Sequence, residues 1–116
     1  MTRAAIAWTL FVWGLCSLPS ATIPAVSFLP FSFDKWVHAG LFAVFGALWL
    51  LARPGEATRV FAWGVAFGIG IELWQWMLPI GRLADPLDAA ADVVGLALGI
   101  GLVWAVGNVS GRGVSR

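Results

Sequence analysis

The chain has 116 residues, of which 60% are hydrophobic and only 11% are charged, whereas soluble domains carry about a quarter charged residues. So few polar side chains cannot cover a water-exposed surface, and a formal net charge of +1 provides no basic field for nucleic acid. One cysteine and one histidine also exclude an internal disulfide and a Cys/His zinc cluster. The composition therefore predicts an integral membrane protein whose partner is the lipid bilayer and not nucleic acid.

The apolar residues form four segments, each close to the roughly 20 helical residues needed to cross a bilayer core of about 30 Å. We expect an all-α, four-helix transmembrane bundle that forms a single domain over 1–116, with a flexible tail at 108–116. The predicted spans are 4–20, 35–52, 59–78 and 87–107.

The first span follows Arg3 and has the charge pattern of a signal peptide. However, Leu18-Pro19-Ser20-Ala21 lacks a clean small-x-small cleavage site, and Leu15 before Cys16 makes a poor lipoprotein site. We therefore expect a retained membrane anchor.

Turn-forming residues separate the spans. Prolines at 19, 24 and 30 oppose a continuous helix over 19–33, so we expect this apolar stretch to lie at the interface or to re-enter the bundle. A single helix of about 30 residues is the alternative. Arg53-Pro54-Gly55-Glu56 ends the second span, and Pro79, Gly81 and Pro86 separate the third from the fourth.

The charges predict the orientation of the bundle, because arginine and lysine accumulate on the cytoplasmic side. Five arginines and only one glutamate fall on the side that holds both termini. The opposite side holds two cations and five carboxylates. We therefore expect a multi-pass protein of the cytoplasmic membrane with both termini in the cytoplasm.

The outer halves of spans two, three and four carry a set of polar side chains at helical spacing. Their i, i+3 and i, i+4 separations place the members of each span on one helix face. Glycines continue two of these faces deeper into the membrane, where small residues let helices approach closely. The faces are Asp34, Lys35 and His38; Gly64, Gly68, Glu72 and Gln75; and Asp88, Asp92, Gly95 and Gly99.

Glu72 and Asp92 lie well inside their spans, where an ionisable group is costly unless it is paired or hydrated. We expect these polar residues and Arg82, which lies in the connecting loop, to share one outer pocket with a functional role. The alternative is structural: Lys35 and Arg82 could simply neutralise acidic partners and hold three helices in register.

These residues resemble the VanZ-like family of small bacterial membrane proteins. The resemblance covers about residues 33–105 and rests on four blocks, Asp34-Lys35-x-x-His38, Glu72-x-x-Gln75, Gly81-Arg82 and Asp88-x-x-x-Asp92-x-x-Gly95-x-x-x-Gly99. The family usually has Asn where Asp92 stands, and the Leu83–Leu87 linker also differs. The resemblance implies a cell-envelope role, because the family's namesake is associated with resistance to the glycopeptide teicoplanin.

We hypothesise an enzyme or modifier that acts at the outer leaflet on a lipid-linked or wall-associated molecule with an anionic head group. The candidate catalytic residues are His38, Glu72 and Asp88. The candidate substrate-binding residues are Asp34, Lys35, Gln75, Arg82 and Asp92.

A divalent metal is a further possibility, with ligands from His38, Glu72, Asp88 and Asp92, although their spacing matches no established metal motif. The absence of Ser and Cys from the set disfavours nucleophilic acyl chemistry. A non-enzymatic binder or transporter and a structural partner subunit remain the alternatives, and the oligomeric state stays open.

Overall fold

The computed structural model describes residues 1–17, 33–78 and 86–110, except for the side chains of 33, 34, 86 and 108–110. Four α-helices make up these residues, namely α1 (Thr2–Cys16), α2 (Phe33–Ala52), α3 (Ala57–Met77) and α4 (Pro86–Ser110). The all-α fold class is confirmed. α1 ends at Cys16, before the end of its predicted span, and α4 continues past its own to Ser110. Residues 19–32 of the expected interfacial segment 19–33 lie outside the described residues, as does the loop that contains Arg82, whereas Phe33 is the first residue of α2.

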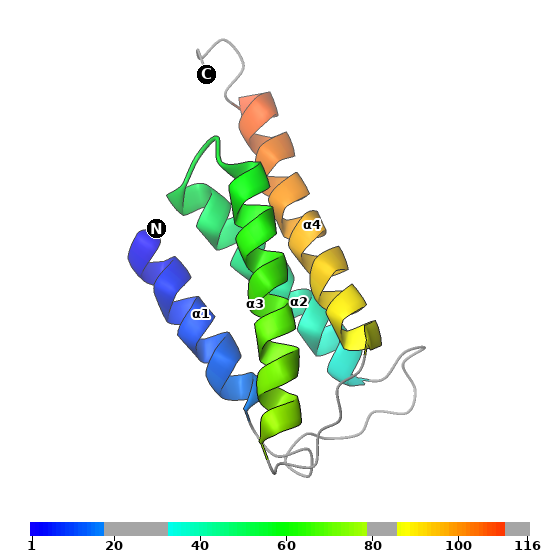
Figure 1. Cartoon of the computed structure of the whole chain (residues 1–116). Coiled ribbons are helices and arrows are strands. Elements are labelled where there is room, and N and C mark those ends of the chain that lie inside the picture. The colour runs from blue at the N-terminus through cyan, green and yellow to red at the C-terminus, as the bar shows by residue number, and fades with distance from the viewer. Residues whose placement is uncertain (18–32, 79–85, 111–116) are drawn as a thin grey trace.

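The helices run alternately up and down, and α2 contacts each of the other three (Figure 1). The start of α1, the α2–α3 turn and the end of α4 lie at one end of the bundle, which we call the turn end. The start of α2, the end of α3 and the start of α4 lie at the other end. We call this the acidic end, because Glu72, Asp88 and Asp92 lie near it.

The turn between α2 and α3 contains the predicted break at Pro54 and Gly55. Gly55 has a φ of 82°, a left-handed conformation that glycine adopts without steric cost. Hydrogen bonds from Arg53 N to Trp49 O (2.9 Å) and from Glu56 N to Arg53 O (3.1 Å) close the turn. This tight connection makes α2 and α3 antiparallel neighbours.

Glycines allow α4 to approach α2 with backbone against backbone. A Cβ atom placed on Gly95 would overlap the carbonyl of Ala39, and one placed on Gly99 would overlap the carbonyl of Ala43. On the α2 side, a Cβ on Gly46 would lie 2.9 Å from the carbonyl oxygen of Leu96. The predicted glycine stripe of α4 therefore faces α2, and the close approach sets the relative rotation of the two helices.

An aromatic cluster fills the space between α2 and α3. The rings of Phe45 and Phe67 stack at 5.2 Å with an interplanar angle of 13°, and Phe42 lies 5.7–5.8 Å from both. α1 joins this core through the indole of Trp8, which donates a hydrogen bond to Leu41 O at 2.9 Å.

The distribution of polarity is that of a helical bundle in a membrane. Large hydrophobic side chains face outward, including Trp63 (71% exposed), Leu98 (66%) and Leu102 (64%). Among the described side chains, five polar or charged ones are instead buried, namely His38, Glu72, Gln75, Asp88 and Asp92. Among the described helices, Lys35–Ala52 of α2 and Leu87–Gly107 of α4 are long and apolar enough to cross a membrane, and α1 is a shorter apolar helix.

Candidate functional site

Three helices carry ionisable side chains to the same depth inside the acidic end. His38 lies five residues after the start of α2, Asp92 six residues after the start of α4, and Glu72 five residues before the end of α3. At a rise of 1.5 Å per residue, each lies about 8–9 Å inside its helix. Antiparallel packing therefore brings residues distant in sequence into one layer of the bundle.

His38 and Asp92 form a buried pair at the centre of this layer. Nδ1 of His38 lies 2.6 Å from Oδ1 of Asp92, and each side chain is only 2% exposed. When Nδ1 carries the proton, it donates to the carboxylate, which fixes the tautomer and the orientation of the ring. The Nε2 atom is then the ring nitrogen that can accept a proton.

Glycines create the space for the Asp92 carboxylate. Gly95, one turn along α4, brings the helix against Ala39 of α2, next to His38. On the other side, a Cβ on Gly68 of α3 would lie 3.2 Å from Oδ2 of Asp92. The glycines selected from the sequence as packing residues thus also position this carboxylate.

Glu72 completes a group of three side chains. It lies one turn after Gly68 on α3 and is 8% exposed. One ligand-capable atom from each of His38, Glu72 and Asp92 lies within 4.8 Å of the others. An imidazole and two carboxylates at this separation could exchange a proton or share a divalent cation. We call these three residues the polar triad.

Lys35 and Asp88 form a second pair, one turn closer to the acidic end. Nζ of Lys35 lies 3.2 Å from Oδ1 of Asp88, and their side chains are 19% and 8% exposed. Asp88 also lies in the first turn of α4, where a negative charge interacts favourably with the helix dipole. The structure therefore places Asp88 with Lys35, and the triad contains Asp92 as the carboxylate from α4.

Gln75 connects α3 to the end of α1. Its Nε2 donates a 2.8 Å hydrogen bond to the backbone carbonyl of Cys16, and the side chain is 1% exposed. This bond satisfies one of the carbonyls that a helix C-terminus leaves without an intrahelical partner. The sequence grouped Gln75 with Glu72 on one face, but it contained no signal for this partner. The side chain of Asp34 and all of Arg82 lie outside the described residues.

Two apolar grooves flank the triad. One, of about 370 Å³, lies between α2 and α4 and includes Lys35, Trp36, Ala39 and Leu87 in its lining. The other, of about 190 Å³, lies between α3 and α4 and includes Asp92 and Gly68. Sequence reasoning missed both grooves, although the small side chains of 89–91 that line them were a visible signal.

Comparison with models of protein families gives a match over most of the chain. The sequence model of the VanZ/LLP1 family matches residues 5–107, so the likeness extends from the three spans identified by their motifs into α1. No curated protein and no solved structure matches the chain.

Proposed function

This chain belongs to the VanZ/LLP1 family, and from that premise and the polar triad we propose that it binds and acts on an envelope molecule at the outer leaflet. The molecule is lipid-linked or wall-associated and carries an anionic head group. The observation that carries the proposal is the convergence of His38, Glu72 and Asp92, from three helices, within 4.8 Å inside an apolar bundle.

The energetic argument favours a function for the triad. Ionisable groups inside a membrane protein cost several kcal/mol unless they are compensated, and well-packed apolar residues of similar size are often no less stable. A purely structural role would need only the Lys35–Asp88 pair and the glycine contacts to hold α2 against α4. The additional buried imidazole and two carboxylates are typical of a proton-transfer or binding site.

We assign roles from the geometry. His38 is the acid–base group, Asp92 orients its imidazole, and Glu72 is the second proton acceptor or donor. The groove between α2 and α4 holds the apolar tail of the substrate, with the ammonium group of Lys35 in its lining to attract the anionic head. Asp88 keeps that ammonium in place.

The acidic end faces the outside of the cell in this proposal, and the turn end faces the cytoplasm. The support comes from the charges: the described residues of the turn end include Arg3, Arg53 and Arg59, whereas the acidic end carries most of the carboxylates. This orientation presents the triad to molecules of the outer leaflet of the cytoplasmic membrane.

A susceptibility assay tests the proposal. Wild type, His38→Gln, Glu72→Gln and the outward-facing control Leu98→Ala are expressed at matched levels in a teicoplanin-sensitive bacterium. We expect wild type and the control to raise the inhibitory concentration of teicoplanin and both triad variants to lose this effect, because they remove a proton-transfer group. Equal protection by wild type and the triad variants would refute a functional triad. No protection by any of them would refute the link to resistance.

A cation site is the second candidate, and the 4.8 Å spacing of the triad favours it. Three ligand atoms about 2.1 Å from one tetrahedral ion lie about 3.4 Å apart, so atoms up to 4.8 Å apart must move inward by roughly 1 Å for binding. One nitrogen and two carboxylate oxygens suit divalent metals such as Zn²⁺ or Mn²⁺.

Metal content distinguishes the two candidates. Purified wild type, Glu72→Gln and the turn-end control Glu56→Gln are equilibrated with Zn²⁺ or Mn²⁺ and measured by elemental mass spectrometry. A metal centre predicts one ion per chain in wild type and in the control, and its loss in Glu72→Gln. Equal content in all three would eliminate the metal candidate and leave acid–base chemistry.

A further inference from the structure

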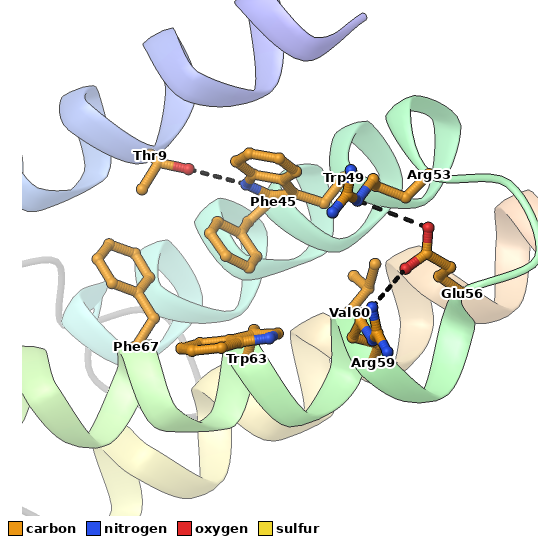
Figure 2. A pocket seen from close by; sticks show the side chains of 9 residues that line it. All are labelled: Thr9, Phe45, Trp49, Arg53, Glu56, Arg59, Val60, Trp63 and Phe67. Carbon is orange, nitrogen blue, oxygen red and sulfur yellow. Dashed lines mark hydrogen bonds and ion pairs between the residues drawn. The ribbon is translucent and has the colours of Figure 1, made fainter.

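Besides the two grooves beside the triad, a separate pocket lies at the turn end. It has a volume of about 320 Å³ and lies between α1, α2 and α3 (Figure 2). Arg59 at its edge is 13 residues from Glu72 along α3, which corresponds to about 20 Å along the helix axis. The charged rim of the pocket is therefore distant from the triad, and no triad residue lines the pocket. Its size is within the range of about 300–1,000 Å³ found for small-molecule sites.

The walls of this pocket are apolar, and three of the four aromatic side chains are held by ring contacts or a hydrogen bond, whereas Trp63 is 71% exposed. Phe45 and Phe67 stack against each other, and Trp63 lies beside them on α3 (Figure 2). The indole of Trp49 donates a 2.9 Å hydrogen bond to Oγ1 of Thr9, which itself donates to Ala5 O at 2.8 Å. Because the polar atoms of Thr9 and Trp49 are used in these bonds, the interior presents carbon to an occupant.

The rim of the pocket is cationic. Glu56 lies between two arginines, with its Oε2 3.6 Å from Nε of Arg53 and its Oε1 3.4 Å from Nη1 of Arg59. Both distances exceed the 2.7–2.9 Å of a strong charge-assisted hydrogen bond. The two arginine side chains are 56% and 69% exposed, so their ion pairs with Glu56 contribute little free energy. An anionic ligand such as a phosphate group can therefore bind both arginines without the loss of a strong contact. One carboxylate and two guanidinium groups leave a net positive rim.

The first turn of α3 adds to this positive field. α3 begins at Ala57, directly after Glu56, and its first turn contains no acidic side chain. Glu56 makes no side-chain hydrogen bond to the helix N-terminus, so the partial positive charge of the backbone N–H groups is not capped by that carboxylate. An anionic group held by the arginines would also lie close to these N–H groups.

We propose that this pocket binds an anionic phospholipid from the leaflet at the turn end, with the phosphate at Arg53 and Arg59 and an acyl chain between the aromatic walls. The apolar interior excludes a fully charged soluble ligand, and the cationic rim selects a phosphate head group over a zwitterionic one. The rim also lies where α2 and α3 meet their connecting turn at one end of the bundle, and we place this end at the level of the lipid head groups. The bound lipid fills the space between α1 and the α2–α3 pair.

Lipid titrations of the detergent-purified full chain, followed by native mass spectrometry, test this inference. The ligands are phosphatidylglycerol, phosphatidylcholine with the same acyl chains, and water-soluble glycerol phosphate. We expect phosphatidylglycerol to bind at least about fivefold more tightly than phosphatidylcholine, the ratio that corresponds to about 1 kcal/mol for an exposed ion pair. Equal affinity for both lipids would overturn the proposal. Equally tight binding of glycerol phosphate would identify a free-anion site and also overturn it.

Two matched pairs of variants locate the binding. Arg59→Gln should weaken phosphatidylglycerol about fivefold, whereas Arg3→Gln, which removes the same charge from an exposed position at the same end, should change it less than about twofold. Trp63→Ala removes a wall and should weaken both lipids, whereas Trp104→Ala, an exposed tryptophan of α4 outside the pocket, should weaken neither. Equal losses within either pair would show non-specific association with the basic or aromatic surface and refute the assigned pocket.

Discussion

Gly99→Ala and Gly101→Ala should change the stability of the bundle in opposite directions, although both lie on α4 two residues apart. A Cβ on Gly99 would overlap the carbonyl oxygen, carbonyl carbon and Cα of Ala43, all of them backbone atoms that cannot rotate away. A Cβ on Gly101 meets nothing within 4 Å. The first substitution must therefore push α4 away from α2, and the second only replaces a poor helix former by a good one.

The expected magnitudes follow from these contacts. Overpacking costs about 1–3 kcal/mol, and a clash with backbone belongs at the upper end of that range. Helix propensity returns about 1 kcal/mol, which leaves Gly99→Ala destabilised by about 2 kcal/mol and Gly101→Ala stabilised by up to about 1 kcal/mol. For a domain of about 100 residues, 1 kcal/mol corresponds to about 4–8 °C in Tm, so the two variants should melt more than 10 °C apart.

The intrinsic tryptophan fluorescence of both variants, followed on heating in the same detergent, gives the two melting temperatures. Circular dichroism at about room temperature checks that both variants are folded before heating. In a lipid-like solvent the hydrophobic effect does not hold the helices together, and their association depends on close packing. The loss of the α2–α4 contact should therefore appear directly in the Tm. Indistinguishable melting temperatures for Gly99→Ala and Gly101→Ala would refute the backbone contact between α4 and α2.

Three further predictions concern the triad and the orientation. Glu72→Gln should melt at the same temperature as wild type or higher, because the buried carboxylate serves function; a large decrease in Tm would assign it a structural role. Asp92→Asn should keep a hydrogen bond to His38, nearly the wild-type Tm and most of the protection against teicoplanin, because the amide oxygen can accept the bond from Nδ1 and the family usually has Asn at this position; a complete loss of protection would show that the charge of the carboxylate is needed. In a cysteine-free background, an impermeant maleimide added to intact cells should label Leu87→Cys and not Pro54→Cys; the reverse pattern would invert the proposed orientation.

The sequence alone was sufficient for the class of protein and for the approximate positions of its helices, although α1 ends before its predicted span does and α4 continues past its own. Composition decides that the chain belongs in lipid, because its polar side chains are too few to cover a soluble core. Proline and glycine at 54 and 55 decide where α2 ends and α3 begins, through local backbone geometry. Helical periodicity also identified the polar and glycine faces, since residues three or four apart share a face wherever a helix forms.

Only the tertiary structure decided which polar groups meet. Periodicity gives the face of each helix but neither its rotation nor its height relative to a neighbour, so the sequence could not separate Asp88, which pairs with Lys35, from Asp92, which pairs with His38. A backbone hydrogen-bond partner, such as the Cys16 carbonyl that accepts from Gln75, cannot be predicted from residue type, because every residue has a backbone carbonyl. These contacts depend on the separation, rotation and relative height of whole helices. The glycine spacing predicts a close approach on one face of α4, but it identifies neither the partner helix nor the height at which the two helices meet, which the packing of the bundle sets.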